Sequence, residues 1–104
     1  MTTYLISYDL NEGSNDHGYI SETLRNTYKA EKFLKLTTTW VIDCGVTMIE
    51  QVDNFLRKHL QKSGSLFIIP FGVDVDQFDF CSFVKNGETI NPADITFVLG
   101  FNRA

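Results

Sequence analysis

One carboxylate stands out because of its place in the sequence. Asp9 directly follows Tyr4 to Tyr8, a short run of aromatic and branched residues typical of a β-strand. A carboxylate at a strand end can bind Mg²⁺, although this ion usually takes further oxygens from the protein or a phosphate. A second copy of the chain, related by a two-fold axis, could bring its own Asp9 to the same ion. Alternatively, Asp9 caps the following loop in an Asx-turn, with Asn11 nearby.

The histidines and the other acidic residues suggest weaker candidates. His17 is expected in the loop near the end of the first strand, where it could act as an acid or base or simply be exposed. His59 is expected at the end of a helix, where a protonated imidazole interacts favourably with the helix dipole. Asp74, Asp76 and Asp79 lack the glycine and the distant glutamate of a calcium loop, which favours a solvated strand or arm.

The remaining reactive side chains fit structural roles. Cys44 and Cys81 show neither CxxC spacing nor a zinc-ligand cluster, so we expect two reduced thiols. The threonines at 37–39 favour a cross-strand ladder with Trp40 packed in the core, and an exposed polar and aromatic surface is the alternative. The sequence offers no Ser/His/Asp or Cys/His constellation and no glycine-rich phosphate loop.

The first half of the chain predicts a strand, a helix and two further strands. After the strand at 3–9, the glycine and small polar residues of 11–18 indicate a loop. A helix is expected from an N-cap at Asp16 to Ala30, because apolar residues recur there every four positions at Ile20, Leu24 and Tyr28. Residues 33–44 are rich in β-branched side chains and long for one strand, so a bend near 36–38 should divide them.

A second helix and a fourth strand follow. Gly45 should end the preceding strand, and Thr47 with Glu50 matches a capping box. Apolar residues then follow at spacings of three and four, namely Ile49, Val52, Leu56 and Leu60, until Ser63-Gly64 ends the helix. The apolar run at 66–69, before Pro70, predicts a buried strand.

This order predicts an α+β fold of the ferredoxin-like kind, a split βαβ (βαββαβ) sandwich. Two helices should cover one face of an antiparallel sheet, and a second copy is the simplest cover for the other face. Residues 1–104 are expected to form one domain, with a core at 1–71 and a C-terminal extension at 72–104. Within the extension, 73–80 could be a strand or an irregular arm, Asn86-Gly87 indicates a turn, and 95–101 should be a last strand, added across the dimer.

Composition excludes several classes of protein. The chain has 104 residues, 43% of them hydrophobic, as in a small globular domain. Its formal net charge of −4 argues against a strong non-specific nucleic-acid binder, although it permits a local basic patch or a metal ion. No signal peptide pattern and no apolar run near the ~20 residues of a membrane helix is visible, so we expect a cytoplasmic protein that does not contact the membrane.

Several of these segments together resemble a known family. The opening Tyr4-Leu-Ile-Ser-Tyr-Asp-Leu10, the Thr38-Thr-Trp-Val-Ile42 strand, the capped helix and the Ser65-Leu-Phe-Ile-Ile69 strand are similar to the Cas2-like family of small CRISPR-associated nucleases with a ferredoxin-like fold. The similarity is nearer to stand-alone relatives than to members from CRISPR loci, and it covers roughly residues 1–71. It implies a homodimer, nucleic acid as substrate, and Mg²⁺ held near paired aspartates.

The resemblance assigns roles to individual residues. The aspartate that ends the first strand in the family corresponds to Asp9, and the small hydroxyl residue of the third strand corresponds to Thr39. Family members also commonly carry an acidic and basic pair soon after the first strand. This chain instead has the residues at 14–19, which contain no basic pair, and Arg25 comes later.

Two functional hypotheses follow from these observations. The first is a homodimeric, metal-dependent endonuclease for RNA or DNA, in which paired Asp9 carboxylates bind Mg²⁺ that activates water and stabilises charge on the phosphate. The second is a non-catalytic dimeric adaptor or antitoxin-like regulatory protein with the same fold. The negative charge and the missing basic pair favour the second.

Overall fold

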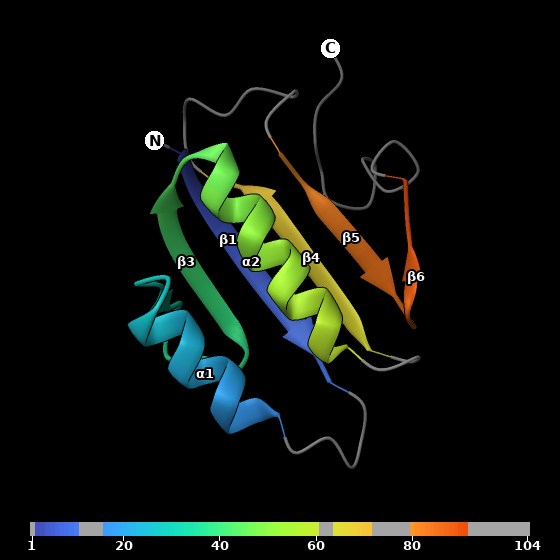
Figure 1. Cartoon of the computed structure of the whole chain (residues 1–104), viewed down its shortest axis with the longest axis horizontal. Helices are drawn as coiled ribbons and strands as arrows, with labels where there is room; N and C mark the ends of the chain where they lie inside the picture. The colour runs from blue at the N-terminus through green and yellow to red at the C-terminus, as the bar shows by residue number, and fades with distance from the viewer. Residues whose placement is uncertain (1, 11–15, 61–63, 72–79, 92–104) are drawn as a thin grey trace.

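The computed structural model describes residues 2–10, 16–60, 64–71 and 80–91. Its elements, in chain order, are β1 (Thr2–Asp9), α1 (His17–Asn26), β2 (Glu31–Lys32), β3 (Thr39–Cys44), α2 (Val46–His59), β4 (Ser65–Pro70), β5 (Ser82–Lys85) and β6 (Glu88–Thr89). The strands form one six-stranded antiparallel sheet in the order β2-β3-β1-β4-β5-β6. Both helices lie on the same face of this sheet (Figure 1). The predicted α+β class is therefore confirmed.

Strand β1 crosses the middle of the sheet and shows why the core lies on the helix side. Successive side chains of a strand point to opposite faces. Tyr4, Ile6 and Tyr8 are buried in the core against the helices, whereas Leu5 and Ser7 are only partly buried on the other face. Strands β3 and β4 alternate in the same way, so the opposite face is formed by every second residue of the three central strands.

The helices present the apolar stripes that the sequence predicts. Ile20 and Leu24 of α1 are fully buried, and so are three residues of α2 with the predicted spacing, Ile49, Val52 and Leu56. The predicted end of α1 at Ala30 is wrong, because the helix ends at Asn26 and Lys29 adopts a left-handed backbone (φ 59°) that an α-helix cannot continue. Helix α2 ends at His59, before the stop predicted at residues 63 and 64. Residue 63 lies outside the described residues.

Neither predicted side-chain cap forms. Asp16 occupies the N-cap position of α1, but its carboxylate makes no capping hydrogen bond. Gly45 is the N-cap of α2, and the helix begins at Val46 without a side-chain cap, so the predicted capping box of Thr47 and Glu50 is wrong. Gly45 does end β3 as expected. Glycine is tolerated at an N-cap, and Gly45 has the extended backbone that this position requires (φ −84°, ψ 176°).

The predicted bend between two strands is a longer turn. Residues 33–38 connect β2 to β3, because Leu34 and Lys35 have positive φ angles (53° and 60°) that a strand cannot adopt. The first arm of the pair is consequently only Glu31–Lys32 rather than the start of the 33–44 run. This short β2 forms one edge of the sheet.

Beyond β4, a hairpin extends the sheet on its other side. Strand β5 pairs with β4, and β6 pairs with β5 around the predicted turn at Asn86-Gly87, whose φ angles are both positive (51° and 82°). Two positive φ angles match a type I′ hairpin turn. Strand β5 itself was not predicted. The predictions for 95–101 and for most of 73–80 fall outside the described residues.

A buried polar network attaches this hairpin to α2. The Arg57 Nε donates to both carboxylate oxygens of Asp53 (3.2 and 3.0 Å), and its two remaining nitrogens donate to Ser82 Oγ and Thr89 Oγ1, each at 2.8 Å. Ser82 Oγ also donates to Asp53 Oδ1 at 2.6 Å. The network fixes β5 beside β4, and so fixes the position of Lys85. Within the described part of the chain, neither helix is long and apolar enough to cross a membrane.

Candidate functional site

Asp9 is exposed at the last position of β1, on the sheet face that the helices leave uncovered. Its place follows from the alternation of the strand, because Ser7 and Asp9 point to the face opposite Tyr8. Across the sheet Asp9 pairs with Ser65 of β4, and the register of β4 with β5 places Lys85 next in the same row. Three strands that are distant in sequence thus bring a carboxylate, a hydroxyl and an ammonium group to one end of this face.

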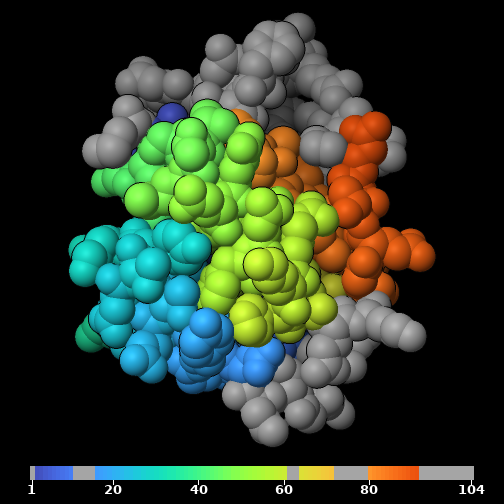
Figure 2. All heavy atoms as spheres, viewed as in Figure 1, coloured from blue at the N-terminus to red at the C-terminus, as the bar shows by residue number. Residues whose placement is uncertain are grey.

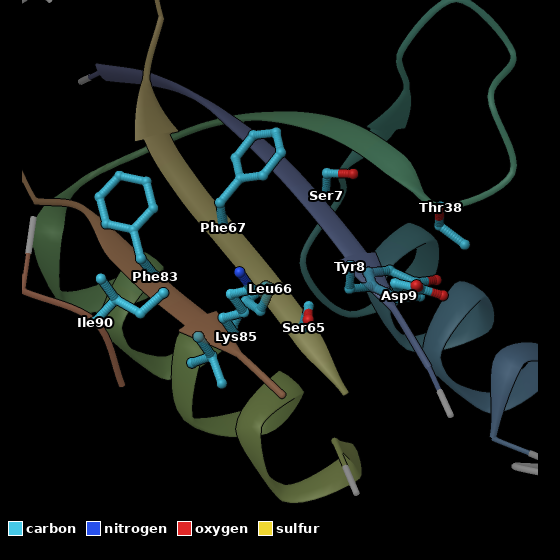
Figure 3. A pocket seen from close by; sticks show the side chains of 11 residues that line it. Ser7, Tyr8, Asp9, Thr38, Ser65, Leu66, Phe67, Phe83, Lys85 and Ile90 are labelled. Carbon is cyan, nitrogen blue, oxygen red and sulfur yellow. The ribbon is translucent and has the colours of Figure 1, made fainter. Parts of the chain in front are cut away.

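An open pocket of about 480 Å³ contains this row (Figure 3). Its polar lining comprises Ser7, Asp9, Thr38, Ser65 and Lys85. Its apolar lining includes Phe67 and Phe83, a directly opposed cross-strand pair, together with Ile90. We call this pocket the Asp9 pocket. It combines hydroxyl and charged groups at one end with an aromatic wall at the other.

Hydrogen bonds hold the strands around Asp9 in place. The hydroxyls of Ser7 and Thr39 lie 3.1 Å apart across β1 and β3. The Tyr8 amide donates to the Thr38 carbonyl (3.2 Å), and the Asn86 amide donates to Ser65 Oγ (3.2 Å). Paired strands and a tight turn therefore fix the backbone that carries the pocket residues.

The number of carboxylates in the Asp9 pocket determines how many protein ligands a Mg²⁺ ion could find there. Asp9 is the single carboxylate among the described residues that line the pocket, and no group of three or more His, Cys, Asp or Glu residues in the described ranges could hold a metal ion. Magnesium in phosphate-processing sites is commonly bound by one or two carboxylates, substrate phosphates and waters. The described lining therefore supplies one carboxylate, and a Mg²⁺ ion here would need further oxygens from a phosphate or a second chain.

The two histidines lie away from Asp9. His17 is the first residue of α1 rather than a loop residue, and its ring faces Tyr8 on the helix side of the sheet, with 6.4 Å between ring centroids. His59 ends α2 as predicted, and its Nδ1 lies 2.8 Å from a carboxylate oxygen of Asp16. Its ring also lies against the rings of Phe55 and Tyr19. His17 is thus exposed at the start of α1, as one of its two interpretations predicted, and His59 is partly buried where the two helices meet.

The other predicted positions divide into confirmed, wrong and untested ones. Trp40 is fully buried in the core as expected, and Thr39 contacts Ser7 across the strands. The predicted threonine ladder over 37–39 is wrong, because Thr37 and Thr38 lie in the turn before β3. Cys44 and Cys81 are free thiols, as expected. The acidic run at 74–79 lies outside the described residues.

Sequence reasoning missed the neighbours of Asp9 in the pocket. Ser65 and Lys85 reach Asp9 only because β4 and β5 pair in this register. A local signal for β5 was present, since Ser82-Phe-Val-Lys85 directly precedes the Asn86-Gly87 turn. No family model matches the chain, and no curated protein sequence matches it significantly.

Proposed function

We propose that the protein is a homodimeric, Mg²⁺-dependent phosphodiesterase acting on RNA or DNA, with Asp9 as its metal-binding carboxylate. The observation that carries this proposal is the row of Asp9, Ser65 and Lys85 in one open pocket. In a metal-dependent phosphodiesterase a bound cation activates water, and positive charge stabilises the transition state. Asp9 supplies an oxygen ligand for the cation, and Lys85 supplies an ammonium group for the phosphate.

The fold supports the dimer in this proposal. We assign β1 to β4 with both helices to the ferredoxin-like class, because they follow the βαββαβ order. The uncovered face carries partly exposed apolar residues on neighbouring strands, including Leu5, Val41 and Ile69. A two-fold dimer through this face would bury them and would bring the Asp9 residues of both copies toward one axis.

The aromatic wall suits a nucleic-acid substrate. Phe67 lies next to the polar row and is only partly buried, and bases stack on such rings with little regard to sequence. A nucleic-acid strand with one base stacked on Phe67 would place the neighbouring phosphate near the polar end of the pocket. The proposed substrate is therefore a single-stranded or unpaired segment of nucleic acid.

The test is a cleavage assay with labelled single-stranded RNA and DNA, in Mg²⁺ and in EDTA. We expect Mg²⁺-dependent cleavage by the wild-type chain and a loss of at least about 100-fold in Asp9→Asn, the scale of effect for a metal ligand or its supporting residues. Asp43→Asn is the matched control, because Asp43 is an exposed aspartate on the same sheet face at the other end of the paired strands. Equal cleavage by Asp9→Asn and wild type would refute this role of Asp9.

A second function has its own supporting observation. Asp9 is the single carboxylate of the pocket among the described residues, while much of the uncovered face is apolar. A non-catalytic dimeric adaptor or antitoxin-like regulator would use that face for assembly and would need no complete metal site. Absence of cleavage on every substrate, combined with a stable dimer, would favour this second function.

A further inference from the structure

Positive charge gathers at one edge of this acidic chain. Four of its nine basic side chains fall between residues 25 and 35, where Glu31 is the one acidic residue. The four are Arg25, Lys29, Lys32 and Lys35, and we call them the β2-edge cluster. The segment that carries them forms a continuous surface beside α1, in cyan and teal in Figure 2. A chain with a net charge of −4 thus concentrates cations where the sheet ends.

Two of these cations are held together over one aromatic ring. Lys32 Nζ lies 4.4 Å from the centre of the Trp40 ring, and the Arg25 guanidinium carbon lies 5.6 Å from it. Trp40 is fully buried, so the indole fixes both cationic groups at the surface of the core. Burial and the neighbouring positive charge of Arg25 lower the pKa of Lys32.

The positive charges of this pair are not neutralised within the described residues. No ion pair joins Arg25 or Lys32 to a carboxylate in the described ranges, and Glu31 projects to the other side of β2 from Lys32. The buried Trp40 Nε1 also has no hydrogen-bond partner there. An anion bound between the two cations would relieve their mutual repulsion.

We propose that Arg25 and Lys32 bind a backbone phosphate of a single nucleic-acid strand, and that Lys29 and Lys35 extend this contact along the strand. Four cations spread along one short segment favour a phosphate polymer over a single small anion. Lys32 pairs with Trp40 across β2 and β3, and both side chains lie on the helix side of the sheet, so the cluster lies on the face opposite the Asp9 pocket. The choice of ligand rests on the proposed function, whereas binding at the cluster does not require cleavage.

The test measures binding of a fluorescein-labelled single-stranded oligonucleotide to the full chain by anisotropy, in EDTA and at several salt concentrations. We expect Arg25→Gln/Lys32→Gln to bind roughly tenfold more weakly, because two charge-assisted phosphate contacts are lost. The slope of log affinity against log salt should fall by about 1.4, or about 0.7 for each lost contact. Lys58→Gln is the matched control, since Lys58 is exposed on α2 outside the cluster.

Trp40 provides a second readout because it is the only tryptophan in the chain. Binding of an unlabelled oligonucleotide should change the intrinsic fluorescence of the wild-type protein with the same midpoint as the anisotropy, since the bound phosphate shifts the cations over the indole. Circular dichroism of the double variant verifies that it is folded. A folded double variant with wild-type affinity and salt slope would overturn the proposal, as would a variant that fails to fold combined with no fluorescence response in the wild type.

Two further comparisons make the outcomes distinct. Vesicles containing anionic phospholipid should bind much more weakly than the oligonucleotide, and preferential vesicle binding would assign the cluster to a membrane and overturn the proposal. If binding depends on Arg25 and Lys32 but no cleavage occurs, the phosphodiesterase function fails and the phosphate site stands. If cleavage requires Asp9 but the double variant binds normally, the phosphate site fails alone.

Discussion

At the scale of single residues, Asp9 and Lys85 carry opposite charges in one row of side chains. Asp9 is exposed and forms no ion pair within the described residues, so its carboxylate can bind a cation. Lys85 is also exposed, at the end of β5. A phosphate placed between them would contact a metal ion bound by Asp9 on one side and the Lys85 ammonium group on the other. Both positive charges would stabilise the negative charge that develops on the reacting oxygens.

The two thiols provide a prediction about pH. Burial, and to a smaller extent the neighbouring Asp43 charge, raises the pKa of Cys44, and burial raises the pKa of Cys81. Both groups therefore stay protonated in the folded chain at a pH where an unfolded chain has begun to ionise. Their contribution to stability is present below the ordinary thiol pKa and is lost as the pH rises through the raised value.

The measurement is the rate of modification by a disulfide reagent as a function of pH, in buffer and in urea. We expect the native chain to react more slowly and its pH midpoint to lie above that of the unfolded chain. Coincident pH midpoints for the native and unfolded chains would contradict this account of the thiols.

At the scale of elements, the attachment of the β5–β6 hairpin to α2 determines whether Lys85 reaches the pocket. Asp53 is almost fully buried and accepts hydrogen bonds from Arg57 and Ser82. Asp53→Ala should lower the free energy of unfolding by about 2 kcal/mol, because it leaves buried donors without an acceptor. Chemical denaturation measures this, with Glu50→Ala, an exposed position on the same helix, as the control. An equal effect of both substitutions would show that the network does not stabilise the fold.

The turn between β5 and β6 supports a second prediction at this scale. Gly87 has a φ of 82°, in the left-handed region where a side chain is strained. Gly87→Ala should lower the free energy of unfolding by about 1 kcal/mol, measured by thermal or urea unfolding. Gly45→Ala is a suitable comparison, because Gly45 has a negative φ and nothing lies within 4 Å of an added Cβ. A smaller loss at Gly87 than at Gly45 would contradict the turn assignment.

The same elements show how much of the fold the sequence could predict. Apolar spacing located α1, α2 and β4 well, because each buries a regular stripe or run. The end of α1 and the length of the 33–38 turn depend on three residues with a left-handed backbone, Lys29, Leu34 and Lys35. None of them is glycine, so their residue types do not predict this conformation. The Asp9 position was predictable from its strand, but Ser65 and Lys85 come to it through pairing of distant strands, which local patterns do not specify.

At the scale of the whole molecule, the two faces of the sheet differ. One face is covered by both helices (Figure 1), while partly exposed apolar residues remain on the other. Val41 lies on this second face, opposite Leu5 in the strand pairing. The proposed dimer would bury this face, and it would bring together two copies of the one carboxylate that the described residues supply to the pocket.

A dimer formed through the uncovered face should be disrupted by a charge placed on that face. Val41→Lys should convert a dimer into a monomer, because it would place two unpaired charges in the buried interface. Sedimentation velocity measures the change, and Met48→Lys, at an exposed apolar position on α2, should leave the dimer intact. A wild-type chain that sediments as a monomer at every concentration would rule out the shared site.

The most direct test of the central proposal is the number of metal ions bound per chain. Manganese can replace Mg²⁺ as a spectroscopic probe, and electron paramagnetic resonance measures the free ion during a titration. If two Asp9 carboxylates share one ion, we expect one bound ion for every two wild-type chains. We expect no such binding by Asp9→Asn and unchanged binding by Asp43→Asn. Wild-type binding that persists in Asp9→Asn, or that is absent from the wild-type dimer in the presence of an oligonucleotide, would contradict the proposal.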